Sequence, residues 1–216
     1  MKKATTSFTL RIVAIAFALV FTAAGYTSGA QEVTEFKGEK LTPLKEQGNT
    51  YIGTPPEVDL AKYRLKIMGK VNKPVDVSYE DVLAMPQESK VITLQCVEGW
   101  SFKALWTGVR IADLAALAEA DPKVKTVIFH EIGGTYSSAL PFDYIKEKNI
   151  LLAFRINGLE LPRDRGFPFQ VCAEDKFGYK SVKWVGRIEF SDKDYQGYWE
   201  KRGYSNSADI KKKQDS

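Results

Sequence analysis

The chain of 216 residues contains two cysteines, Cys96 and Cys172, and these are the side chains best suited to redox or soft-metal chemistry. A deprotonated thiol is a nucleophile and a metal ligand, whereas two thiols in an oxidising compartment can form a disulfide. The spacing along the sequence leaves both interpretations open, because it does not establish whether the two cysteines are neighbours in the fold.

The single histidine, His130, excludes several kinds of site. A bis-histidine haem and a multi-histidine zinc site each need more than one histidine, and the chain has no C-x-x-C-H motif for a c-type haem. A serine hydrolase would have to use His130, yet no G-x-S-x-G motif accompanies it. We therefore expect His130 to be a strand residue with a satisfied hydrogen bond.

Two basic segments have the residue types that bind a phosphate. Residues 163–170 contain Arg163 and Arg165, and a guanidinium binds phosphate through two parallel hydrogen bonds. Residues 178–184 begin with a glycine turn that can expose backbone N–H groups, and they add a hydroxyl and two amines from Lys180, Ser181 and Lys183. The alternatives are a solvated basic turn for the first segment and a strand with outward lysines for the second.

Residues 1–30 have the pattern of a secretory signal peptide. Lys2, Lys3 and Arg11 are followed by a short apolar run over residues 12–24 and by small residues at Ser28 and Ala30. The run is short for a bilayer span, although a retained anchor helix is the alternative. The prediction is a periplasmic or secreted protein.

The charge of the chain gives no indication of a nucleic-acid partner. Its formal net charge is +4, and the leader carries three of the positive charges and no acidic residue, which leaves +1 for the rest. A nucleic-acid-binding domain would have a basic stripe. We expect an N-terminal arm over residues 31–60, a domain over residues 61–204 and a polar tail over residues 205–216.

The hydrophobic pattern predicts a mainly β, α+β fold with short helices. Ser78 and Asp81 have the spacing of a capping box, which predicts a short helix ending before Pro86, and residues 111–120 have helical periodicity. Asn157-Gly158 predicts a tight hairpin turn. Strands are expected at residues 63–67, 91–94, 124–132, 150–156, 159–161, 167–173 and 181–190.

Several segments resemble the sulfite oxidase family, which includes the periplasmic methionine-sulfoxide reductase catalytic subunits. They are YRLKIMGKVNKPVDVSYEDVLAMP, VITLQCVEGWSFKALWTGVRIADLAALA, INGLELPRDRGFPFQV, GYKSVKWVGRIEF and GYWEKRGY, and they cover residues 60–204. The resemblance implies the sulfite-oxidase molybdopterin-binding fold with one molybdenum. The metal is held by the dithiolene of a pterin and by one cysteine thiolate, which the motif match gives as Cys96.

The resemblance also implies roles for other residues. It gives catalytic or funnel positions to Trp100 and Tyr136, and it puts the cofactor against the arm and both basic segments. Many relatives have an arginine where this chain has Gln170, and Arg163 or Arg165 can compensate for that charge. The implied cofactor-binding residues are Asn49, Tyr51, Glu131, Arg163, Arg165, Gln170, Lys180, Ser181, Val182 and Lys183.

The implied function is oxygen-atom transfer on a small sulfur or nitrogen oxo-compound. The chain has no ligand set for a haem or an iron–sulfur cluster, so we expect electrons to be exchanged with an external cytochrome or membrane haem subunit. The rival hypotheses are a cofactor-free binding module on the same fold and a thiol/disulfide protein that uses Cys96 and Cys172. Two observations favour the cofactor-free module, namely Gln170 and a leader with Lys2-Lys3 in place of an arginine pair.

Overall fold

The computed structural model describes residues 31–210, and the predicted signal peptide lies outside this range. Two five-stranded sheets form the body, and the arm adds a small hairpin of β1 (Glu35–Phe36) and β2 (Glu39–Lys40). The mainly β, α+β prediction is confirmed, because the helices are few and short. Within residues 31–210 no helix is long and apolar enough to cross a bilayer.

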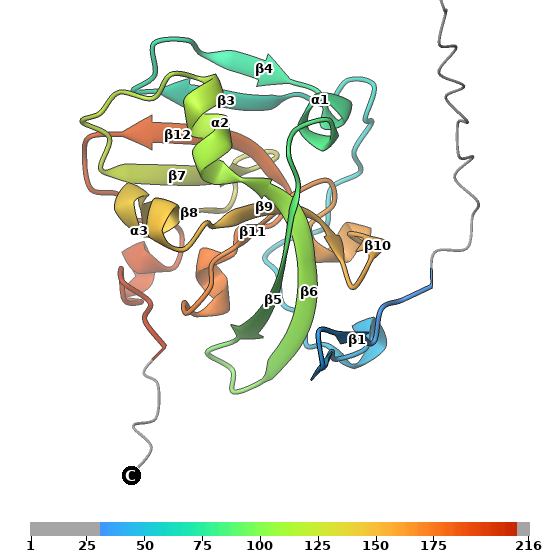
Figure 1. Ribbon diagram of the computed structural model, residues 1–216. Helices are drawn as coiled ribbons and strands as arrows, with labels where there is room; N and C mark the ends of the chain where they lie inside the picture. The colour runs from blue at the N-terminus through green and yellow to red at the C-terminus, as the bar shows by residue number, and fades with distance from the viewer. Residues whose placement is uncertain (1–30, 211–216) are drawn as a thin grey trace, which may run out of the picture.

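The first sheet contains the long hairpin of β5 (Glu88–Gln95) and β6 (Ser101–Arg110), which extends below the rest of the body in Figure 1. The strand order is β10-β9-β6-β5, with β11 (Gln170–Cys172) also paired to β9 (Leu151–Ile156). The Asn157-Gly158 turn joins β9 to β10 (Leu159–Glu160), as its sequence predicts. The tip of the β5–β6 hairpin carries Cys96.

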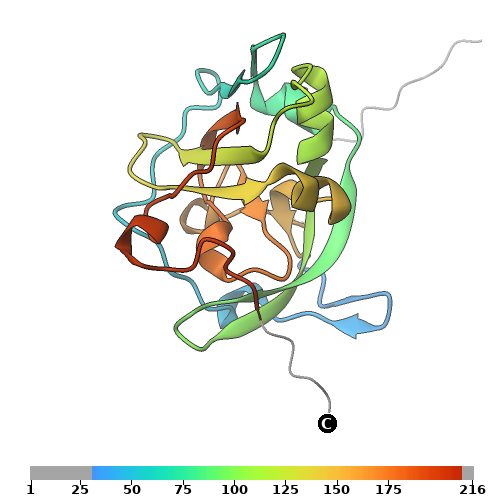
Figure 2. The same ribbon diagram turned by 90° about the vertical axis from the view of Figure 1, so that its left-hand side faces the viewer.

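The second sheet has the order β4-β3-β12-β7-β8. Its strands are β3 (Leu65–Gly69), β4 (Val75–Val77), β7 (Thr126–Glu131), β8 (Ser137–Pro141) and β12 (Val185–Ser191). Figure 2 shows the C-terminal segment, in red, beside the hairpin of β7 and β8. This contact is made by hydrogen bonds from Tyr198 N to Ser137 O and from the Ser138 hydroxyl to Glu200.

Within the described residues, three short α-helices and four 3-10 turns accompany the strands. The predicted capping box is confirmed, because Ser78 and Asp81 bond each other's backbone at the start of α1 (Tyr79–Leu83). The other elements are α2 (Ile111–Leu117), α3 (Phe142–Glu147), η1 (Leu44–Glu46), η2 (Arg163–Arg165), η3 (Gly178–Lys180) and η4 (Glu200–Arg202).

A large apolar core joins the sheets and helices. Leu114 of α2, Phe129 of β7, Phe154 of β9 and Ile188 of β12 belong to one cluster and are fully buried. Burial of each such side chain contributes about 1.5–3 kcal/mol, so this cluster fixes the sheets relative to each other. A second cluster around Trp106 lies in the β5–β6–β9 sheet and supports the hairpin that carries Cys96.

The structure corrects the sequence-based elements in several places. Elements β4, β8 and α3 were not predicted, and the strand expected at residues 167–173 covers only Gln170–Cys172. Residues 181–184 are not part of a strand: Trp184 has a φ of 51°, and β12 begins only at Val185. A left-handed φ interrupts an extended strand. The ten-residue strand β6 was not predicted, because its many inward-facing side chains hide the alternation of a half-buried strand.

Candidate functional site

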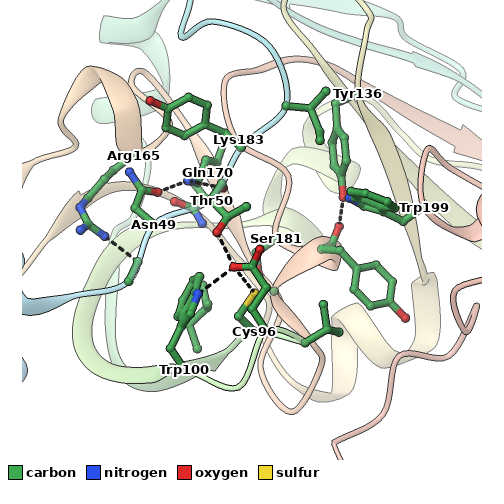
Figure 3. A pocket seen from close by; sticks show the side chains of 18 of the residues that line it. Asn49, Thr50, Cys96, Trp100, Tyr136, Arg165, Gln170, Ser181, Lys183 and Trp199 are labelled. Atoms are coloured by element: carbon green, nitrogen blue, oxygen red, sulfur yellow. Dashed lines mark hydrogen bonds between the residues drawn. The ribbon is translucent and has the colours of Figure 1, made fainter.

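A cleft of about 1050 Å³, part of it open to solvent, lies where the tip of the β5–β6 hairpin meets the arm, η3 and the C-terminal segment. Figure 3 shows arm residues and Lys183 on one side of it, Tyr136 and Trp199 on the other, and Cys96 between them. Of the residues predicted for the site, nine line this cleft: Asn49, Tyr51, Cys96, Trp100, Tyr136, Arg165, Gln170, Ser181 and Lys183.

Cys96 directly follows β5 and is held in a tight turn. Its backbone N–H donates to Trp100 O at 2.9 Å, and its carbonyl accepts from Gly99 N, where a φ of 94° favours glycine. The side chain is half-buried, and burial raises the pKa of the thiol. The free thiol is therefore protonated at neutral pH, and a metal that binds the sulfur displaces this proton.

The two cysteines do not form a disulfide in the structure, since both are free thiols. Cys172 lies in β11 and is only 3% exposed, within the apolar cluster around Trp106. Burial raises the pKa of its thiol well above the ordinary value. A buried, protonated thiol is a poor nucleophile, so the geometry gives no support to the thiol/disulfide hypothesis.

The carboxylate of Glu98 lies beside the Cys96 sulfur. One oxygen, Oε2, accepts hydrogen bonds from the Thr50 hydroxyl at 2.8 Å and the Trp100 indole at 2.9 Å, and it lies 3.7 Å from Cys96 Sγ. The bonds from Thr50 and Trp100 hold the pKa of Glu98 below its usual range. Cys96 is therefore next to a fixed negative charge that also joins the arm to the hairpin tip.

The amine of Lys183 lies on the arm side of the cleft (Figure 3). It donates to the Asn49 side chain and, at 3.0 Å, to Thr50 O. Burial, with a smaller contribution from the charge of Arg165, lowers the pKa of Lys183 to about 8. Tyr51 packs edge-on against Trp184 with a centroid distance of 5.6 Å, which holds the same stretch of arm.

Arg165 fastens the arm to the body. Its guanidinium donates to the carbonyls of Leu44, Gln47 and Gly48 at 2.7–3.3 Å and to the Gln47 side chain. It is 8% exposed and lies over the Phe102 ring at 5.9 Å. Most of its N–H groups therefore donate to the arm. The main role of Arg165 in this structure is to hold the arm against the body, and few of its donors are left for a phosphate.

The opposite wall of the cleft is aromatic. The Tyr136 hydroxyl donates to Tyr179 O at 2.5 Å, and burial raises the pKa of Tyr136, so this phenol stays neutral. Near the floor, Gln170 is buried and Ser181 accepts a hydrogen bond from Ala173 N. Neither Gln170 nor Ser181 brings a charge to the cleft.

Four residues predicted to bind the cofactor do not line this cleft. Val182 belongs to the core, and Lys180 is 1% exposed in a buried ion pair with Glu200. Arg163 donates to the carbonyls of Pro55 and Pro56. Glu131 accepts from Tyr136 N and faces a separate cleft.

His130 is a strand residue, as predicted, and its ring nitrogens contact polar partners. Nε2 lies 3.1 Å from Glu189 Oε2, and Nδ1 lies 3.0 Å from Arg187 Nη2. Its side chain faces away from the main cleft and lines the separate one that also contains Glu131.

Several residues that line the cleft were not predicted from the sequence. Thr50 is an arm residue without a motif, and Glu98 follows the cysteine but received no role. The aromatic residues Tyr179, Trp184, Trp199 and Tyr204 also line it. All four belong to the segments 178–190 and 197–204 that carry the family resemblance, so the motifs contained a signal for the aromatic wall.

Comparison with known proteins identifies the family. The model of the oxidoreductase molybdopterin binding domain matches residues 51–199. The chain belongs to this family. It is 34% identical over 152 residues to the uncharacterized oxidoreductase YuiH of Bacillus subtilis, which covers 70% of this chain and 76% of YuiH. The family match makes the chain a molybdenum-dependent oxidoreductase with a molybdenum–molybdopterin cofactor.

Other relatives are longer than the matched region. The chain is 29% identical to the protein-methionine-sulfoxide reductase catalytic subunit MsrP of Ralstonia nicotianae, over 74% of this chain and 57% of MsrP. It is 28% identical to mouse mitochondrial sulfite oxidase, over 71% of this chain and 34% of that protein. The crystal structure of the sulfane dehydrogenase SoxCD from Paracoccus pantotrophus has the same fold, with a TM-score of 0.60, 24% identity and coverage of 64% and 40%.

The cleft fits a molybdopterin. A soft sulfur donor, Cys96, lines it, and Lys183 supplies positive charge for an anionic group. Trp106 also lines it and is 2% exposed, and its indole Nε1 has no hydrogen-bond partner within residues 31–210. An unpaired buried donor is costly, so a bound acceptor atom would stabilise this wall.

Proposed function

We propose that this chain transfers an oxygen atom to or from a small sulfur or nitrogen oxo-compound, and that a neutral S-oxide suits the site best. The observation that carries the proposal is the Cys96 thiol inside this cleft, 3.7 Å from the carboxylate of Glu98. Cys96 is the proposed protein ligand to the metal. The bound molybdenum supplies a centre that exchanges one oxygen atom and two electrons with the substrate.

The overall reaction for a sulfoxide is R₂SO + 2 e⁻ + 2 H⁺ ⇌ R₂S + H₂O. The sulfur–oxygen bond breaks in the forward direction, and the oxygen leaves as water after taking up two protons. Within this reaction Trp100 holds the Glu98 carboxylate beside Cys96, while Lys183 and Asn49 fix the arm over the cleft. These contacts orient the site and limit the access of water to it.

The substrate preference is argued from charge. The Glu98 carboxylate is ionised at neutral pH, and like charges in a partly enclosed site repel. Neither Arg165 nor Lys183 forms an ion pair with Glu98 among the described residues, because both donate to the arm instead. A neutral S-oxide avoids this repulsion and gains apolar contact with the aromatic wall, whereas the sulfite anion would be repelled by the Glu98 carboxylate.

The rest of the proposal concerns the partner and the compartment. Electrons reach the site from an external one-electron carrier, a cytochrome or a membrane haem subunit. The predicted signal over residues 1–30 would send the chain to the periplasm or outside the cell, and a fusion of these residues to a reporter enzyme tests this by its export.

The rival hypothesis of a cofactor-free binding module is not supported, because the family match indicates a molybdenum–molybdopterin cofactor.

The test measures molybdenum and oxidised-pterin fluorescence in the native protein, then turnover of methionine sulfoxide and of sulfite with viologen or ferricyanide dyes. We expect roughly one molybdenum per chain and sulfoxide turnover above sulfite turnover. Cys96→Ser is expected to lose activity while it remains folded, and Cys172→Ala, the matched control, is expected to keep it. Metal-free native protein, or full activity in Cys96→Ser, would overturn the proposal.

A further inference from the structure

A continuous chain of aromatic rings leads from the cleft to the surface. Tyr136, which lines the cleft, contacts Tyr198 with a centroid distance of 5.6 Å. Tyr198 contacts Trp199 at 5.3 Å, Trp199 contacts Tyr204 at 4.8 Å, and Tyr179 contacts Tyr204 at 5.3 Å. These are ordinary distances for edge-on and tilted aromatic pairs, so no gap separates one ring from the next.

The chain of rings ends in the open. Tyr204 is 36% exposed although it also lines the cleft, and it lies two residues after the end of η4. Tyr204 therefore connects the aromatic wall of the cleft to solvent.

Two cations border this exit. Lys201 and Arg202 are exposed, and neither forms a salt bridge with any residue between 31 and 210. The Arg202 guanidinium lies 3.6 Å from the Tyr198 ring centroid, and the Lys201 amine lies 5.6 Å from that of Tyr195. Asp209, later in the same segment, is paired with Lys176, so Lys201 and Arg202 supply unpaired positive charge at this exit.

The 3-10 turn η4 beside the exit is held in place by buried polar contacts of Glu200. Glu200, whose side chain is 1% exposed, accepts from Lys180 Nζ and from the Ser138 hydroxyl, each at 2.5 Å. Lys180 also donates to Ala139 O. A preformed surface loses little entropy when a partner binds, which suits a short-lived electron-transfer complex.

We propose that the surface formed by Lys201, Arg202 and Tyr204 is where a one-electron haem protein with an acidic face docks. The idea rests on the proposed function, since it concerns where the electrons of that reaction enter or leave. Two successive transfers, each converting one ferrous haem to ferric, supply the two electrons that one S-oxide consumes. Opposite charges guide the haem edge to the rings, and this steering accelerates association.

The test uses the metal-loaded chain with an acidic probe, the soluble haem domain of a cytochrome b5. The variant Lys201→Glu/Arg202→Glu reverses the charge of the exit, and Lys73→Glu/Lys123→Glu, in the β3–β4 turn and the α2–β7 loop, reverses the same number of exposed charges elsewhere. The first readout is the dissociation constant for the oxidised haem domain by calorimetry, and the second is its oxidation rate with methionine sulfoxide. Reduced viologen, a small donor that needs no docking surface, serves as the reference.

In the exit variant we expect the dissociation constant for the haem domain to rise, and the kcat/KM for its oxidation to fall, each by at least about 10-fold. Both quantities should also depend less on salt concentration than in the native chain. Viologen-driven turnover and the Lys73/Lys123 control are expected to stay within about twofold of the native chain. Equal losses in both charge variants, or no loss in the exit variant, would overturn the docking surface. A native chain without viologen turnover would count against the proposed function, while the calorimetry would still decide the docking surface.

Discussion

Replacing Lys180 with methionine tests how the buried ion pair holds the C-terminal wall of the cleft. Methionine fills a similar volume but leaves the Glu200 carboxylate, 1% exposed, without its cation. One oxygen of that carboxylate already has no partner within residues 31–210. Removing one member of a buried pair costs about 3–5 kcal/mol, and about 2–4 °C of Tm is lost per kcal/mol in a domain of this size. The expected fall in Tm is therefore about 6–20 °C.

The assay is thermal unfolding followed by circular dichroism at pH 7, on metal-free protein so that cofactor loss does not contribute. Lys180→Met/Glu200→Gln, which removes the stranded charge, is expected to recover at least half of the loss. Ser138→Ala removes a single hydrogen bond to the same carboxylate and is expected to cost about 1.5–3 kcal/mol. A Lys180→Met protein within about 2 °C of the native Tm would refute the reasoning, because the pair would then contribute nothing to the fold.

Three further predictions concern the cleft. Glu98→Gln is expected to narrow the preference for methionine sulfoxide over sulfite about tenfold in kcat/KM, because the repelling charge is gone; an unchanged ratio argues against a charge filter. Lys183 has a pKa lowered to about 8 in the fold, below that of the unfolded chain, so its contribution to the free energy of unfolding should rise with pH from about 8 to 10.5. Urea titrations of the metal-free chain should show that rise flattened in Lys183→Met, and equal slopes would contradict the burial of the amine. Arg165→Ala should expose the first part of the arm, residues 31–48, to proteases. Arg163→Ala, which removes contacts only at residues 55–57, should not, and equal cleavage within residues 31–48 would contradict the role of Arg165 in holding the arm.

The elements that depend on local signals were predictable from the sequence. The Ser78–Asp81 capping box and the Asn157-Gly158 turn each depend on residues within a few positions of each other, and both form as expected. Strand β6 escaped prediction because it is buried along most of its length, which removes the alternation of a half-buried strand.

Site residues were predictable where a family motif contains them. They were less predictable where tertiary packing decides whether a side chain reaches the cleft. Lys180 and Lys183 look alike in the sequence, yet one is buried against Glu200, 20 residues away, and the other reaches the arm. Arg163 and Arg165 also differ in their partners, since only Arg165 donates to η1, at the Leu44 carbonyl, whereas Arg163 donates to Pro55. No local pattern distinguishes these pairs, because the partner that captures each side chain is distant in sequence.

The most direct test of the central claim is X-ray absorption at the molybdenum K-edge of the metal-loaded chain, compared between the native protein, Cys96→Ser and Cys172→Ala. If Cys96 is the protein ligand, the native spectrum and that of Cys172→Ala contain three sulfur scatterers, two from the pterin and one from the protein. Cys96→Ser would then retain two. An identical sulfur count in the native and Cys96→Ser spectra would contradict the account.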